Sequence, residues 1–319
     1  MCRWKYGRNT TGVGKMPWCW KSRSSNCIRE KSMQAKTVVE CHNKLGEGPI
    51  WHPLEKCLYW LDILEKKIQR YDPHRDEYQV FKVGQKVSAL GLRGTDSFIT
   101  AGENGFAFWY RHWGTFRFIS NPEQGKTEAR FNDGKVDRDG RFWAGTMTAE
   151  GASSKLYKLD ENLAVAPMIE NVTISNGIGW SPDDRIMYYA DTRRFTIYAY
   201  DFDHEHGEIS NKREFVRFNG ENGIPDGLTV DGEGYVWCAL WGGWRVERYS
   251  PAGECVESVE VPVAQPSSCT FGGDDFGTLY ITSAREGMSK THLGEQPQAG
   301  NLFACQPGVR GLPEPKFAG

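Results

Sequence analysis

The chain has 319 residues, of which 39% are hydrophobic and 25% charged, an ordinary composition for a globular protein. No stretch approaches the roughly 20 consecutive apolar residues of a membrane-spanning helix, so no membrane partner is expected. Eight basic residues and one acidic residue fall in residues 1–32, which leaves residues 33–319 with a net charge of −9. Because binding to phosphates needs a basic face, this acidic body argues against a nucleic-acid partner.

The first 32 residues differ from the rest of the chain. They are basic, and their tryptophans follow neither a helical nor a strand period. We therefore predict a basic N-terminal extension over 1–32 that is not part of the fold, and a single domain over 33–319. Nine cysteines without a C-x-x-C pair indicate reduced thiols in a cytoplasmic protein rather than a disulfide framework.

The body repeats one unit six times in chain order. Each repeat opens with a short apolar strand, and the last residues of these strands are spaced by 41, 44, 44, 50 and 41 positions. The six candidate inner strands are 49–51, 90–92, 134–136, 178–180, 228–230 and 269–271.

Further strands follow each inner strand. Second strands such as Leu58–Leu61 and third strands such as Thr196–Tyr200 are rich in aromatic and β-branched residues, and turn pairs such as Asp139-Gly140 separate them. Four strands per unit at a period of ~40–50 residues are typical of a β-propeller. We predict an all-β, six-bladed β-propeller with four-stranded blades. The strand around 37–40 is expected to complete the last blade, and 285–299 to form an inserted loop.

A polar residue stands four positions before the end of every inner strand. Equivalent positions of the blades converge on the axis at one rim, so carboxylates and amides there would need a cation between them. Oxygen ligands favour a hard ion such as Ca²⁺, Mg²⁺ or Mn²⁺, with Zn²⁺ as a further possibility. The six residues are Glu47, Ser88, Asn132, Asn176, Asp226 and Ser267.

Two other features are weaker candidates for a site. His204-Glu205-His206 has the spacing of metal ligands but lies in a polar run, which predicts an exposed hairpin loop. Asp191 and Trp241 follow second strands and could lie near the pocket, although a structural role is the simpler interpretation.

The motifs around the polar positions resemble the regucalcin (senescence marker protein)/gluconolactonase family, which includes luciferin-regenerating proteins. The resemblance covers about residues 35–319. It is carried by Leu45-Gly46-Glu47-Gly48-Pro49-Ile50-Trp51, Arg130-Phe131-Asn132-Asp133-Gly134-Lys135, Ala144-Gly145-Thr146-Met147, Ile174-Ser175-Asn176-Gly177 and Ile224-Pro225-Asp226-Gly227.

This resemblance implies a six-bladed propeller that binds one divalent metal and hydrolyses sugar lactones. The family's metal ligands match Glu47, Asn176 and Asp226. Its substrate-binding residues match Arg130, Asn132 and Glu150. The segment from Thr148 to Lys155 is shorter than in regucalcin, so Glu150 is aligned only by counting forward from the preceding motif.

The residues then suggest a mechanism. The metal would polarise the lactone carbonyl, Asp226 would take a proton from water, and Arg130, Asn132 and Glu150 would bind sugar hydroxyls. We expect a divalent-metal-dependent lactonase acting on an aldonolactone such as gluconolactone, with Ca²⁺ as the first choice of ion, and a monomer or weak dimer. The alternatives are a non-catalytic calcium-binding regulatory propeller, a hydrolase of another ester or nitrile, and a protein-interaction scaffold.

Overall fold

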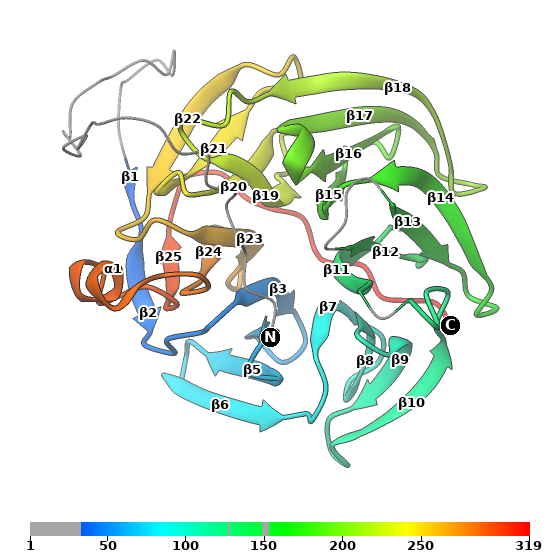
Figure 1. The fold of residues 1–319 in the computed structure, drawn as a ribbon, viewed down its shortest axis with the longest axis horizontal. Helices are drawn as coiled ribbons and strands as arrows, with labels where there is room; N and C mark the ends of the chain where they lie inside the picture. Colours follow the sequence, from blue (N-terminus) through cyan, green and yellow to red (C-terminus); the bar gives the residue numbers. More distant parts are fainter. Residues whose placement is uncertain (1–32, 127, 149–152) are drawn as a thin grey trace, which may run out of the picture.

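The computed structural model describes residues 33–126, 128–148 and 153–319. The strands form six sheets arranged as blades around a central axis, so the chain is a six-bladed β-propeller, as predicted (Figure 1). The predicted N-terminal extension, residues 1–32, lies outside the described residues.

The first three blades each run from an inner strand outwards in chain order, with neighbouring strands antiparallel. The first blade contains β3 (Gly46–His52), β4 (Cys57–Asp62), β5 (Lys67–Asp72) and β6 (Glu77–Lys82). The second contains β7 (Val87–Leu92), β8 (Ser97–Gly102), β9 (Gly105–Tyr110) and β10 (Thr115–Ser120). The third contains β11 (Arg130–Val136), β12 (Phe142–Met147), β13 (Ser154–Leu159) and β14 (Val165–Val172).

The remaining blades keep this order, and two of them recruit strands from the start of the described chain. The fourth contains β15 (Ser175–Trp180), β16 (Ile186–Asp191), β17 (Thr196–Asp203) and β18 (Glu208–Arg217), with a 3₁₀ turn, η1 (Thr192–Arg194). The fifth contains β19 (Ile224–Val230), β20 (Val236–Trp241), β21 (Arg245–Tyr249), β22 (Cys255–Glu260) and β1 (Met33–Gln34). The sixth contains β23 (Pro266–Gly272), β24 (Thr278–Ser283), β25 (Leu302–Cys305) and β2 (Lys36–Val39), with α1 (Lys290–Glu295) inserted before β25.

The ring closes through β2, which confirms the role predicted for this part of the chain. β2 is the outer strand of the sixth blade and pairs antiparallel with β25, with Thr37 opposite Phe303 and Val39 opposite Leu302. In addition, β1 pairs in parallel with β22 at the edge of the fifth blade, with Met33 opposite Val259. The start of the described chain therefore joins the last two blades.

The core lies between the faces of neighbouring blades. β4, β7 and β8 are buried along their whole length, whereas the outer strands β6 and β10 are mostly exposed or half-buried. Tyr59 of the first blade packs against Phe98 of the second, with ring centroids 4.9 Å apart. Strands covered on both faces read as continuous apolar runs, which explains the aromatic second and third strands in the sequence.

A repeated aspartate–tryptophan pair fixes two of the inner turns. Trp143 donates its indole N–H to Asp137 at 2.8 Å, and Trp237 donates to Asp231 at 2.9 Å. Each aspartate also accepts the backbone N–H four residues further on. The buried carboxylate thereby organises the turn and ties it to the second strand of the blade.

The C-terminal segment, residues 306–319, crosses the ring (Figure 1). It lies at the C-terminal ends of the inner strands, whereas Glu47 and Asp226 lie near the N-terminal ends of theirs. Gly311 bridges to Asp231, and Lys316 bridges to Leu92. Inside the central channel, the Glu314 carboxylate lies 2.9 Å from the Lys135 ammonium. This segment therefore acts as a strap that covers one end of the channel.

The cysteines only partly follow the expectation of reduced thiols. Cys41, Cys57, Cys238, Cys269 and Cys305 are free. Cys255 is disulfide-bonded, so the expectation is wrong at this position.

Candidate functional site

The polar residues predicted from the repeats lie at irregular points of the inner strands. The pairing register shifts between Phe131 and Gly134, between Ser175 and Ile178, and between Pro225 and Leu228. A similar shift follows Glu47 in β3. β-Bulges leave residues out of the ladder and re-aim their side chains. These shifts explain how Asn132, Asn176 and Asp226 can lie within strands and still face the axis.

A cavity of about 1270 Å³ opens at this end of the axis. Five of the six predicted site residues line it together: Glu47, Arg130, Asn132, Asn176 and Asp226. The sixth, Glu150, lies outside the described residues, so its role stays a prediction. The cavity is large enough for a monosaccharide-sized ligand.

The two serines of the predicted polar ring do not contribute to the cavity wall. Ser267 is buried and donates its hydroxyl hydrogen bond to the carbonyl oxygen of Gly46, while Thr282 lies 3.0 Å away. The hydroxyl of Ser88 is buried without a hydrogen-bond partner among the described residues. The prediction that all six positions face one volume is therefore wrong for these two, because serine is short enough to be buried beside the strand.

A chain of hydrogen bonds fixes the amide side chains across three blades. Arg130 donates to Asn132 Oδ1 at 2.9 Å, and Asn132 Nδ2 donates to Asn176 Oδ1 at 2.9 Å. Asn176 Nδ2 then donates to Thr192 Oγ1 at 2.8 Å, and Thr192 donates to the carbonyl oxygen of Pro225 at 2.9 Å. The amide oxygen of Asn176 has two lone pairs, so it can accept from Asn132 and still ligate a cation.

Asn132 was predicted to bind substrate, but its amide group makes hydrogen bonds within the protein. Its Nδ2 also donates to the carbonyl oxygen of Ser175 at 2.8 Å, so both of its N–H groups are used. The side chain therefore has no free donor for a sugar hydroxyl, although its Oδ1 keeps acceptor capacity. These hydrogen bonds indicate that Asn132 positions the side chain of Asn176.

The carboxyl groups of the site repel one another. Burial, then the charges of Asp226 and Asp133, raise the pKa of Glu47 well above its usual range. Burial, then Asp133 and Glu286, raise the pKa of Asp226. Burial raises the pKa of Asp133 to about 6. A cation between the carboxylates would remove this repulsion.

The donor set fits a hard divalent cation. Glu47 and Asp226 supply carboxylate oxygens and Asn176 supplies an amide oxygen, which are the ligand types of Ca²⁺, Mg²⁺ and Mn²⁺. Within the described ranges, no group of three or more His, Cys, Asp or Glu residues is placed to hold a metal ion. Two carboxylates and one amide would leave the remaining coordination positions to water or substrate.

The sequence did not predict most of the residues at the rim of the cavity. Trp241, at the end of β20, and Trp244 form part of the wall, which agrees with the weaker prediction for Trp241. Glu286 and residues of α1 contribute another part. The only signal for this part was the extra length of the last repeat, which predicted an insertion but not its position over the mouth.

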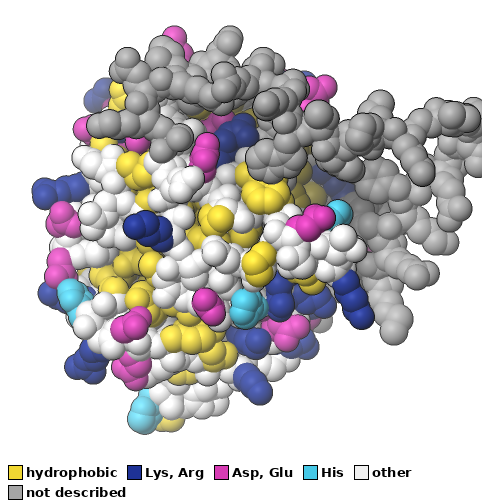
Figure 2. All heavy atoms as spheres, turned by 90° about the vertical axis from the view of Figure 1, so that its left-hand side faces the viewer, with side chains coloured by type: hydrophobic (Ala, Val, Ile, Leu, Met, Phe, Trp, Pro, Cys, Tyr) yellow, Lys and Arg dark blue, Asp and Glu magenta, His cyan; other side chains and the backbone are white. Residues whose placement is uncertain are grey.

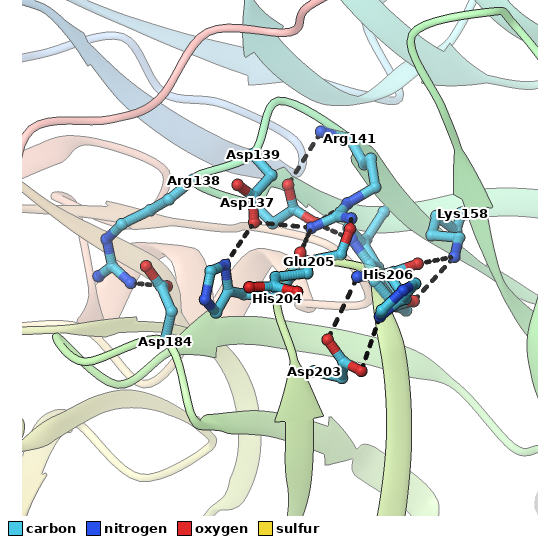
Figure 3. A network of polar contacts seen from close by, with 12 residues as sticks. Asp137, Arg138, Asp139, Arg141, Lys158, Asp184, Asp203, His204, Glu205 and His206 are labelled. Atoms are coloured by element: carbon cyan, nitrogen blue, oxygen red, sulfur yellow. Dashed lines mark hydrogen bonds and ion pairs between the residues drawn. The ribbon is translucent and has the colours of Figure 1, made fainter.

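The histidine pair identified in the sequence belongs to another part of the molecule. His204 and His206 are exposed in the turn between β17 and β18, as predicted (Figure 3). Arg141 donates to the carbonyl oxygens of His204 and Glu205, and Lys158 donates to that of His206 at 3.2 Å (Figure 3). The two histidines instead lie against Asp139 and Asp203. The turn thus connects the third and fourth blades structurally.

Asp191, the other weak candidate, is also structural. It is buried at the end of β16 and accepts hydrogen bonds from the backbone of Thr173 and Ile174. These bonds hold the entry to β15, directly before Asn176. Asp191 therefore supports the site without facing the cavity.

Figure 2 shows the face of the molecule that lies to the left in Figure 1. There the described residues present basic and acidic side chains interspersed, with small hydrophobic patches between them (Figure 2). Among the described residues, no helix is long and apolar enough to cross a membrane.

The chain is similar to known proteins of one family in sequence and in fold. The family model described as SMP-30/Gluconolactonase/LRE-like region matches residues 45–285. Regucalcin from Gallus gallus is 36% identical over 298 residues, which cover 90% of this chain and 99% of that protein. The 6-deoxy-6-sulfogluconolactonase of Pseudomonas putida is 37% identical over 289 residues, covering 89% and 98%. The solved structure of regucalcin from Agrobacterium tumefaciens, described as a calcium-binding protein, superposes with a TM-score of 0.86 at 27% identity, covering 90% and 98%.

Proposed function

Because the chain belongs to the SMP-30/gluconolactonase/LRE-like family, we propose that it is a metal-dependent lactonase that hydrolyses a sugar lactone to the free acid. The observation that carries the proposal is the meeting of Glu47, Asn176, Asp226 and Arg130 in one cavity. The name of the Pseudomonas putida relative supports the type of reaction, since it describes a gluconolactonase, but not the charge of the substrate, since that name specifies a sulfo-substituted lactone.

Glu47, Asn176 and Asp226 would hold the metal. When bound, a divalent cation would polarise the lactone carbonyl and stabilise the negative charge that develops on its oxygen. Ca²⁺ is the first choice, and the description of the Agrobacterium tumefaciens regucalcin as calcium-binding supports it. Zn²⁺, Mn²⁺ and Mg²⁺ are the alternatives to test.

The chain's own residues would manage protons and orientation. Asp226 would take the proton from the attacking water and return it to the ring oxygen as the ester bond breaks. Arg130 keeps further N–H groups besides those donated to Phe131 and Asn132, so it can donate to substrate hydroxyls. Glu150 would accept from a hydroxyl, as the family resemblance implies.

Asp226→Asn tests the catalytic role. It keeps the size and one ligand oxygen but removes the base, so we expect a fall in kcat of at least about a hundredfold. The assay is pH-indicator hydrolysis of a panel of aldonolactones, after chelation and then with each metal restored. Glu295→Gln, which removes a carboxylate on the exposed part of the cavity rim, is the matched control and should keep most activity.

The second candidate is a calcium-binding propeller without catalysis, which the descriptions of the regucalcin relatives favour. Calorimetry of Ca²⁺ binding on the same samples separates the two functions. Tight binding without turnover of any lactone would contradict the lactonase and leave the second candidate. Metal-restored turnover that Asp226→Asn abolishes would contradict the second.

A further inference from the structure

We propose that Glu286 selects substrates by charge, disfavouring lactones that carry an acidic group and favouring neutral ones. The inference rests on the proposed lactonase function and extends it to the class of substrate. It is carried by a half-buried carboxylate that faces the cavity without an ion-pair partner.

The backbone fixes Glu286 at the cavity wall. The N–H of Arg285 donates to the carbonyl oxygen of Lys44 at 3.1 Å, and the N–H of Ala284 donates to that of Gln265 at 3.0 Å. The side chain of Gln265 in turn donates to the carbonyl oxygen of Glu286 at 3.2 Å. Glu286 is therefore held between the sixth and first blades, at the start of the inserted segment that carries α1.

The carboxylate of Glu286 is available to act on a ligand. It lines the same cavity as Glu47, Arg130 and Asp226. Its side chain makes no direct hydrogen bond or ion pair with any other residue that the structure describes. Burial raises the pKa of Glu286, and the charges of Arg130 and Lys44 partly offset that rise. Its charge nevertheless reaches the reaction centre: burial lowers the pKa of Arg130, and Glu286 is the largest charge opposing that shift.

The wall as a whole is negative. Glu47, Asp226, Glu286 and Glu295 supply four carboxylates, and Arg130 is the single Lys or Arg among the described lining residues. A divalent cation held by Glu47 and Asp226 would neutralise those two carboxylates and leave Glu286 as the half-buried carboxylate of this wall, since Glu295 is exposed. In a partly desolvated cavity the field of this carboxylate is weakly screened and acts strongly on a second charge.

This arrangement has two consequences for the reaction. A lactone bearing a phosphate or sulfonate would be repelled by Glu286 on entry, whereas a neutral polyhydroxy lactone would not. The product of a neutral lactone is a carboxylate anion, so the same charge would favour its release. Glu286 would therefore act on specificity without touching the reacting atoms.

The experiment compares kcat/KM for D-glucono-δ-lactone, which is neutral, and 6-phospho-D-glucono-δ-lactone, which is anionic. Glu286→Gln keeps the shape and removes the charge, so the ratio of anionic to neutral kcat/KM should rise about tenfold or more. Glu286→Asp keeps the charge and should stay within about threefold of the wild-type ratio. Glu295→Gln removes an exposed charge from the same wall and should also change the ratio by less than about threefold.

An unchanged ratio in Glu286→Gln, or an equal loss for both lactones, would overturn charge selection and leave the proposed function standing. A ratio that rises equally in Glu286→Gln and Glu286→Asp would assign the effect to side-chain shape and overturn it too. If the wild-type protein hydrolyses neither lactone with any of the four metals, the proposed function fails and takes this inference with it. Matching thermal melting curves for the variants exclude misfolding as the source of either result.

Discussion

Glu47 and Asp226 are acidic side chains that are buried close to other carboxylates. Burial and repulsion from neighbouring carboxylates raise both pKa values, so the folded, metal-free protein binds protons at the site that the unfolded chain releases. This contribution to stability is present at acidic pH and is lost as the pH rises through the raised pKa values. A cation that satisfies the carboxylates should therefore stabilise the protein more at neutral than at acidic pH.

We accordingly expect the rise in Tm on adding saturating Ca²⁺ to be larger at about pH 7.5 than at about pH 5. Differential scanning fluorimetry of chelated and Ca²⁺-loaded samples measures it. Asp226→Asn, which keeps one ligand oxygen but no longer titrates, should show a smaller difference between the two pH values. An equal rise at the two pH values would contradict a competition between protons and the cation.

Asn132 illustrates how a residue's role can differ from its motif. Its amide donates to Ser175 and Asn176, so replacing it should loosen a metal ligand rather than remove a substrate contact. We expect Asn132→Ala to weaken Ca²⁺ affinity about 10–100-fold, the usual effect of losing a group that orients a ligand. Calorimetry measures the affinity; unchanged Ca²⁺ binding with a raised KM would instead support direct substrate binding.

The sequence predicted five of the residues that share the cavity but not their mutual contacts, and it wrongly added two serines. Glu47, Asn176 and Asp226 stand at the same offset in different repeats, and symmetry of the ring converts that offset into proximity. Glu286 has no such equivalent in other repeats, because it belongs to the insertion of the last one. A residue outside the repeats has no equivalent position in the other blades, so the repeat pattern could not predict that Glu286 lines the cavity.

At the scale of elements, the bulges at the start of the inner strands depend on glycine. A Cβ on Gly227 would lie 2.1 Å from Ser268 Oγ of the next blade, and one on Gly177 would lie 2.7 Å from the carbonyl oxygen of Asp226. The inner strands therefore approach one another too closely for any side chain at these points. The glycines that follow Asn176 and Asp226 are packing requirements as much as turn residues.

Gly227→Ala should therefore destabilise the protein by about 1–3 kcal/mol, the usual cost of forcing extra atoms into a packed core. Urea unfolding measures the free-energy difference. Gly294→Ala is the matched control, since nothing lies within 4 Å of its position and it occupies α1. Gly227→Ala with the stability of wild type would show that the blades can separate locally.

The repeat pattern predicted the strands and their order well, because period, turn pairs and aromatic runs all agree in each blade. It did not predict the register shifts. A shift such as that between Pro225 and Leu228 changes which residues pair across strands without changing composition or spacing. The Asn-Gly and Asp-Gly pairs were interpretable as turns, and only the neighbouring blade reveals why glycine is required.

At the scale of the whole molecule, the ring is closed by segments from both ends of the described chain. β2 completes the sixth blade, and its strand pattern made that prediction possible. The C-terminal strap was not predicted, because its proline and glycine residues follow no period. Phe317 of the strap packs into the core shared by the second and third blades, and Gly311 bridges to Asp231 of the fifth, so the strap joins blades that are not neighbours.

The Lys135–Glu314 pair provides a test of whether the strap also stabilises the channel electrostatically. The two side chains are 21% and 7% exposed and meet at 2.9 Å, with Thr270 donating to the same Glu314 oxygen at 3.2 Å. Removing one member of a largely buried pair leaves the other charge without its counterion, which costs more than removing both. We expect Glu314→Leu to destabilise by about 2–4 kcal/mol and Lys135→Met/Glu314→Leu by clearly less.

Urea unfolding of both single variants and the double variant gives the coupling energy. Glu214→Gln, which breaks the exposed pair with Arg217, should have no measurable effect and serves as the control. If the double variant loses as much as the sum of the two singles, the pair contributes no coupling. In that case the strap would be held by Phe317 and its backbone hydrogen bonds, such as that from Phe317 to Leu92 at 2.7 Å. A positive coupling would instead make the strap's charge part of what keeps the six blades closed around the site.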